Sequence, residues 1–108
     1  LDAVDVSLLA QIHTCVSTTI DCPINTIKSR IMRIDDFLIG DGLPQDGKEQ
    51  AFVTLWVQVM PGRTIQSREM LANKLKQLLD DYFIESSAKL ALQIRISLTE
   101  LDAEFYVM

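Results

Sequence analysis

Residues 51–59 read AFVTLWVQV, and residues 92–98 read LQIRISL. In both stretches apolar side chains recur at every second position, which is the pattern of a β-strand with one buried face. The buried face of the first stretch is wholly aliphatic: Val53, Leu55, Val57 and Val59. The second stretch alternates Leu92, Ile94, Ile96 and Leu98 with polar residues. Both stretches are therefore predicted to be strands of one sheet.

A helix is predicted between these two strands. Pro61-Gly62 ends the first strand, and Thr64 can cap the open N–H groups of the helix that follows. An apolar stripe at spacings of three and four extends the helix to about Ser86. The stripe consists of Leu71, Leu75, Leu78, Leu79 and Tyr82. A strand, a helix and a strand in this order predict a βαβ crossover unit with parallel strands.

The first half of the chain shows the same order without an opening strand. A helical stripe is formed by Val4, Leu8, Leu9, Ile12, Cys15 and Val16. Asp2 or Asp5 can cap this helix, and Asp21-Cys22-Pro23 ends it. Residues 27–34 then alternate as a strand. One face would carry Ile27, Ser29, Ile31 and Arg33, and the other Lys28, Arg30, Met32 and Ile34.

A helix that feeds a parallel strand needs an earlier strand on which to pack. We therefore predict a single α/β (α+β) domain over residues 1–108, derived from two βαβ units on one four-stranded sheet with two helices on one face. The first unit spans residues 1–36 and lacks its strand, a loop spans 37–49, and the second unit spans 50–101. The chain begins with Leu1 rather than Met, so a trimmed start is expected.

The face of the sheet opposite the helices is predicted to be mixed. It would carry Phe52, Trp56, Gln58, Gln93, Arg95 and Ser97. This mixture is more apolar than ordinary solvent surface and more polar than a dry core. It fits subunit association around water or a ligand, or else a partly exposed aromatic pair.

Composition narrows the class of function. The net charge of −5 argues against a nucleic-acid partner, which needs a basic face. No apolar run approaches the roughly 20 residues of a membrane span, and no signal segment opens the chain. Cys15 and Cys22 would lie about 10 Å apart on one helix, too far to bridge, so we expect two reduced thiols in a cytoplasmic protein.

Candidate chemical groups are few. His13, the one histidine, is expected at the edge of the helical stripe, and the acids at Asp35-Asp36, Asp80-Asp81 and 100–104 are expected to be solvated because they lack metal-ligand spacing. Arg63 lies in a strand-to-helix turn, where α/β sheets bind ligands and a helix N-terminus favours anions. Lys28 and Arg30 share one face of the predicted strand 27–34. These three cations could bind an anion or simply reach solvent.

Three sequence blocks resemble a known family. They are Ile27-Lys28-Ser29-Arg30, Ala51-Phe52-Val53 and Gly62-Arg63-Thr64-Ile65-Gln66-Ser67-Arg68. With the spacing between them, they resemble the 5-carboxymethyl-2-hydroxymuconate isomerase family of the tautomerase superfamily. The likeness runs from about Val6 to Leu101, and the third block is its most specific part.

The resemblance implies a homotrimeric isomerase of aromatic-compound catabolism that uses no cofactor and no metal. In that family the secondary amine of an N-terminal proline moves a proton between carbons of a dienol or unsaturated keto acid. Basic side chains hold the carboxylates of the substrate. Arg63 matches the family's arginine in the Gly-Arg turn, Lys28 matches a position that is usually arginine, and Arg30 lies one pleat away. These three residues are the predicted substrate-binding groups.

Two departures keep alternatives open. Lysine cannot form the two-pronged hydrogen bond of arginine, so Lys28 bears on which substrate the protein binds more than on its fold. Pro23, Pro44 and Pro61 are internal and have no free amine, so no catalytic proline is visible in the sequence. Either the opening strand precedes the printed sequence, or the protein is a non-enzymatic oligomeric ligand-binding module or an inactive paralogue.

Overall fold

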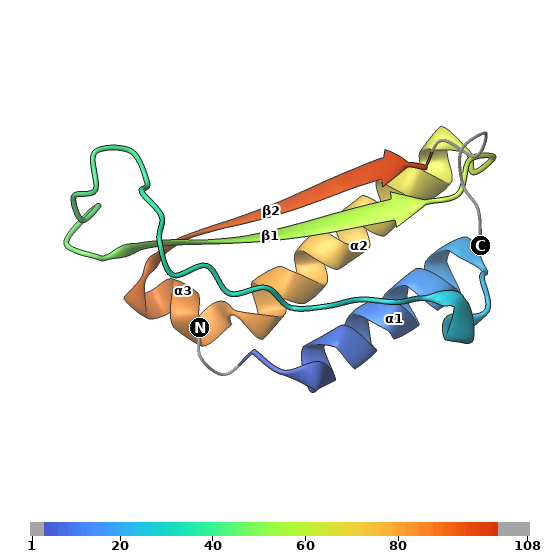
Figure 1. The fold of residues 1–108 in the computed structure, drawn as a ribbon, viewed down its shortest axis with the longest axis horizontal. Helices are drawn as coiled ribbons and strands as arrows, with labels where there is room; N and C mark the ends of the chain where they lie inside the picture. The colour runs from blue at the N-terminus through green and yellow to red at the C-terminus, as the bar shows by residue number, and fades with distance from the viewer. Residues whose placement is uncertain (1–3, 102–108) are drawn as a thin grey trace.

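The computed structural model describes residues 4–101. Its elements, in chain order, are α1 (Val6–Ile20), the 3-10 helix η1 (Ile24–Thr26), β1 (Gln50–Val59), α2 (Ile65–Tyr82), α3 (Ile84–Lys89) and β2 (Ala91–Glu100). Figure 1 shows α1 and α2 on the same side of the two strands. The chain is therefore a mixed α/β fold with one layer of strands and one layer of helices, as the sequence predicts.

The second half of the chain forms the predicted crossover unit. Strands β1 and β2 are parallel and in continuous register from Gln50 opposite Ala91 to Val59 opposite Glu100. Helix α2 connects the two strands and packs on the sheet. The aliphatic face predicted for each strand contacts the helices, so the period-two pattern alone identified the buried side.

The core lies between the two long helices and the inner face of the sheet. Leu71, Leu75 and Leu79 of α2 are the most buried side chains, at 0%, 0% and 1% exposure. They meet the buried stripe of α1, which consists of Leu8, Ile12, Val16 and Ile20. The three-and-four spacing of the sequence thus predicted which face of each helix is buried.

The prediction of one helix through Ser86 was wrong. Helix α2 ends at Tyr82, and Phe83 is both its C-cap and the N-cap of α3. The Phe83 ring is only 3% exposed, and its edge meets the Tyr82 ring with the centroids 5.0 Å apart. Because a straight helix would carry the following residues past the end of the sheet, burial of Phe83 fixes the bend that returns the chain to β2 (Figure 1).

The strand predicted at residues 27–34 was also wrong as a hydrogen-bonded strand. The segment is extended, but within residues 4–101 it joins no ladder, and the sheet has two strands rather than four. Figure 1 shows the segment, in teal, running beside α1. A strand needs a neighbouring strand to share its N–H and C=O groups, and no described residue occupies that position. The opening strand expected before α1 would lie outside the described residues.

Asp5 rather than Asp2 caps α1 among the described residues; Asp2 lies outside them. The Asp5 carboxylate accepts hydrogen bonds from the Ser7 hydroxyl at 2.6 Å and the Ser7 N–H at 2.9 Å. At its other end α1 stops as predicted, because Asp21 adopts a left-handed conformation with φ 51°. Asp5 therefore holds a charged group at the positive end of the helix dipole.

The charge of Asp5 should make the thermal stability of the protein depend on pH in the acid range. The Ser7 hydroxyl and then the Ser7 N–H hold the pKa of the Asp5 carboxyl below its ordinary value. Its stabilisation is thus present above that ordinary value and is lost as the pH falls through the lower folded pKa. We expect the melting-temperature gap between the native chain and Asp5→Asn, which keeps a neutral cap, to shrink between about pH 6 and pH 2. A gap that does not change over this range would contradict the assignment.

The outer face of the sheet has the predicted mixed character. Trp56 is 72% exposed and Phe52 is 38% exposed. Phe52 also meets Phe37 edge to face, with the ring centroids 5.5 Å apart. Opposite these aromatics in the register lie Gln93 and Ser97. No described helix covers this face, and whether a subunit covers it stays a prediction.

Candidate functional site

Arg63 lies in the turn that joins β1 to α2, and its guanidinium is already engaged. Its Nη1 donates a hydrogen bond to the carbonyl oxygen of Ile20, the last residue of α1. The final carbonyls of a helix lack intrahelical partners and carry the negative end of its dipole. Arg63 therefore clamps the C-terminus of α1 to the turn of the second βαβ unit. No local pattern predicts this contact, because the two residues are 43 positions apart.

The same turn presents the N-terminus of α2 at the carboxyl end of β1. Gly62 has φ 106°, a left-handed conformation that lets the chain reverse directly after the strand. The Thr64 hydroxyl accepts from the Ser67 N–H at 3.0 Å and so caps α2 as predicted. Arg68, one turn further on, is held by Glu100 of β2, with Nη1 and Oε1 2.7 Å apart. The turn thus has one cation, Arg63, beside a helix N-terminus and a second cation that is neutralised.

Lys28 and Arg30 lie on the extended segment 27–34, which runs antiparallel to α1. His13 Nε2 and Ser29 Oγ are 2.6 Å apart, and Arg33 Nη2 donates to the Val4 carbonyl at 2.8 Å. Because side chains alternate in an extended chain, Lys28 and Arg30 point away from α1. Both side chains are exposed.

The contacts within residues 4–101 do not join these three cations to one another. Ser29 contacts His13, and Arg63 contacts Ile20. His13 lies seven residues before Ile20 on α1, so the two contacts are about 10 Å apart along the helix axis. Lys28 is therefore nearer to the Arg63 clamp than Arg30 is. Within residues 4–101 no hydrogen bond or ion pair joins either of them to Arg63. A shared substrate site for the three residues stays a prediction.

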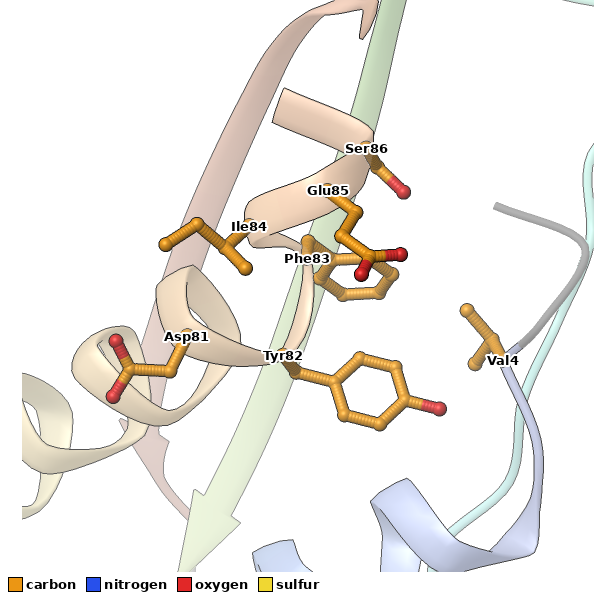
Figure 2. Close-up of a pocket in the computed structure, with 7 residues that line it drawn as sticks. All are labelled: Val4, Asp81, Tyr82, Phe83, Ile84, Glu85 and Ser86. Carbon is orange, nitrogen blue, oxygen red and sulfur yellow. The ribbon is translucent and has the colours of Figure 1, made fainter. Parts of the chain in front are cut away.

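Two surface cavities lie elsewhere. One, of about 320 Å³, opens where α2 bends into α3, with Tyr82, Phe83 and Glu85 in its wall (Figure 2). The other, of about 410 Å³, lies between the turn at Gln45–Lys48 and the start of β2. Neither cavity is lined by Lys28, Arg30 or Arg63. Neither cavity was predicted from the sequence.

The remaining candidates are structural. Asp80 pairs with Lys76, and Asp81 accepts from Gln77 Nε2 at 2.9 Å, so these acids belong to the polar side of α2. Cys15 and Cys22 are free thiols and half-buried. In the part of the chain that the structure describes, no group of three or more His, Cys, Asp or Glu side chains could hold a metal ion. Nor does any helix there have the length and apolar character required to cross a membrane. Glu104, the end of one predicted acidic cluster, lies outside the described residues.

Comparison with known proteins gives two findings. The model of the family described as 5-carboxymethyl-2-hydroxymuconate isomerase matches residues 2–107. A similar solved structure is the crystal structure of a 5-carboxymethyl-2-hydroxymuconate isomerase from Deinococcus radiodurans R1, with a TM-score of 0.84 and 21% sequence identity. The match covers 94% of this chain and 75% of that one. No curated protein matches the sequence. The structural likeness concerns the fold, and the family match concerns nearly the whole sequence.

Proposed function

Because the chain belongs to the 5-carboxymethyl-2-hydroxymuconate isomerase family, we propose that this isomerase moves a proton within an unsaturated dienol or keto carboxylic acid such as 5-carboxymethyl-2-hydroxymuconate. The observation that carries the substrate class is the Arg63 turn. It combines a fixed guanidinium with the N-terminus of α2 at the carboxyl end of β1, and both features favour a bound carboxylate.

Arg63 can serve both α1 and a substrate. A guanidinium has five N–H donors, and the bond to the Ile20 carbonyl uses one of them. The others remain for a carboxylate, whose two oxygens match the arginine fork. Lys28 and Arg30 are proposed to bind a second carboxylate of the substrate as point charge and fork respectively. Withdrawing electron density through these contacts would stabilise the dienolate that forms as the proton moves.

The proposed base is the secondary amine of an N-terminal proline on a strand that precedes α1. An amine that is desolvated beside cations holds its proton less tightly, so it can accept a proton near neutral pH. The proposed reaction removes a proton from one carbon and returns it to another, and it requires no metal or organic cofactor. Such a strand is supported by the segment 27–34, which is extended, and by one edge of β1, because neither pairs with a strand within residues 4–101 and each has backbone groups that a strand would satisfy.

A homotrimer is proposed as the active assembly, in the cytoplasm. Support comes from the outer face of the sheet, where Trp56 is 72% exposed and no helix of residues 4–101 covers the strands. An isolated two-stranded sheet is marginal in water, and further strands would stabilise it. Sedimentation of the native protein should give about three times the subunit mass that intact-mass analysis measures.

The test uses the native gene product with its own N-terminus. Intact-mass analysis identifies the first residue, and ultraviolet absorbance follows conversion of a dienol carboxylic acid to its conjugated ketone. We expect an N-terminal proline and turnover far above the buffer rate. A mature chain without that proline would end the proposed mechanism. Saturable substrate binding without turnover would favour the binding-module alternative, and absence of both would favour an inactive paralogue.

A further inference from the structure

His13 and Ser29 form a side-chain contact that has no role in the proposed function. His13 is on α1 and Ser29 is on the extended segment 27–34, sixteen positions later, with His13 Nε2 and Ser29 Oγ 2.6 Å apart. This distance is at the short end for a hydrogen bond to a hydroxyl. Among the described residues the imidazole has no second hydrogen-bond partner. The hydrogen bond of the ring therefore goes to the segment that carries Lys28 and Arg30.

The contact matters because the segment has few other constraints. Residues 28–34 take part in no strand ladder of the described chain and are exposed. One side-chain hydrogen bond, between Ser29 and His13, ties the segment to α1, and a second, from Arg33 to the Val4 carbonyl, ties its other end to the chain just before α1. The partly buried Ile27 packs against the core just before Ser29. Residue 28 thus lies between the Ile27 contact and the His13 contact, and residue 30 lies between the His13 contact and the Arg33 bond.

Fixing Ser29 also fixes the direction of its two neighbours. In extended chain, residues on either side of a given position point to the opposite face. With Ser29 held against α1, Lys28 and Arg30 must both point away from it. Without that bond, rotation of the Ser29 backbone would let the two cations separate or turn toward α1. Long cationic side chains lose binding energy when they must be ordered only on contact with a ligand.

We infer that His13 is a positioning residue: through Ser29 it holds Lys28 and Arg30 on the face where they bind the carboxylate of an anionic substrate. The inference rests on the proposed function for the identity of the ligand. A serine and a histidine at this distance also resemble a nucleophile and its base. In the described chain, however, no carboxylate orients the imidazole, and Ser29 is exposed. The geometry therefore points to a mechanical role.

The experiment measures binding and turnover separately in the native protein with its full N-terminus. The variants are His13→Ala, His13→Gln, Ser29→Ala and the double variant His13→Ala with Ser29→Ala. We expect His13→Ala and Ser29→Ala each to raise KM about fivefold with kcat within about twofold, because a pre-organising bond is lost and the base is untouched. The double variant should be no worse than either single one. Glutamine can still bond to Ser29, so His13→Gln should restore KM.

A second measurement does not depend on turnover. His13 is the one histidine of the chain, so its imidazole signals in a nuclear magnetic resonance spectrum are unambiguous. Ser29→Ala should shift those signals. Titration with adipate, a saturated dicarboxylate, should give a dissociation constant that rises about fivefold in His13→Ala and recovers in His13→Gln. Thr14→Ala, an exposed neighbour on α1, is the matched control and should change neither constant.

The outcomes separate the two proposals. If adipate binds but His13→Ala binds it as tightly as the native protein, the positioning role is wrong while the proposed function stands. If His13→Gln behaves like His13→Ala, the effect comes from lost packing rather than from the hydrogen bond, and the inference is again overturned. If the native protein neither binds adipate nor turns over a dienol acid, the proposed function fails and the inference fails with it.

Discussion

Replacement of Leu75 by alanine should lower the free energy of unfolding by about 2–5 kcal/mol. Leu75 is 0% exposed and lies at the centre of α2, with Leu71 and Leu79 one turn away on either side. Alanine would remove the contacts of the isobutyl group and leave a cavity that two helices and the sheet cannot fully close. We expect the upper half of the range, because α2 is the element that joins β1 to β2. Urea unfolding followed by circular dichroism measures the change.

Met70→Ala is the matched control on the same helix. Met70 is 50% exposed, so alanine removes mostly solvated surface and should change the free energy of unfolding by less than about 1 kcal/mol. Both variants should be compared at one protein concentration, since association would add to apparent stability. Equal losses from the two variants would show that Leu75 is not the packing centre of the domain.

Much of the fold could be predicted because its patterns are local. The alternation around Val53 and Ile94 identified both strands and their inner faces, and the stripe through Leu75 identified the buried side of α2. The end of α2 could not be predicted in this way. Residues 83–86 carry no proline or glycine, and the bend depends on burial of Phe83 against a core assembled from distant segments. Local propensity allowed the helix to continue, and tertiary packing of Phe83 ended it.

Segment 27–34 shows a different limitation, because its conformation was predictable and its pairing was not. Its alternation placed Ile27 and Ser29 on one side, and in the structure Ile27 packs against the core and Ser29 contacts His13 of α1. Whether such a segment becomes a hydrogen-bonded strand depends on a neighbour, and a neighbour is not a property of the segment itself. The periodicity therefore predicted the conformation and the faces, and not the ladder.

The candidate site was predictable in position and less so in contacts. A Gly-Arg pair between a strand and a capped helix predicted where Arg63 would lie, because the turn chemistry is local. The bond from Arg63 to the Ile20 carbonyl joins residues 43 positions apart, and the bond between His13 and Ser29 joins residues 16 positions apart. The first bond needs α1 to be docked beside the turn before α2, and the second needs the segment after α1 to fold back along that helix. A polar side chain at the edge of an apolar stripe, such as His13, indicates that a hydrogen bond forms there. It does not indicate which residue is the partner.

Replacement of Arg63 by alanine should reduce both stability and activity. Loss of the charge-assisted bond to the Ile20 carbonyl should lower the free energy of unfolding by about 1–2 kcal/mol, the low part of the range because Arg63 is only half-buried. Loss of the proposed carboxylate contact should reduce kcat/KM by about 100-fold. Thermal unfolding and steady-state kinetics on the native gene product measure the two effects independently.

Arg63→Lys separates the clamp from the substrate contact. Lysine can donate one hydrogen bond to the Ile20 carbonyl, so most of the lost stability should return. Its ammonium cannot hold that carbonyl and also present a fork to a carboxylate, so kcat/KM should stay at least about tenfold low. Arg68→Ala, which removes the partly buried pair with Glu100 and leaves Arg63 in place, should lower stability by about 1–2 kcal/mol and leave kcat/KM within about threefold. If Arg63→Lys restored activity as fully as stability, Arg63 would be a clamp alone, and the substrate carboxylate would have to bind elsewhere.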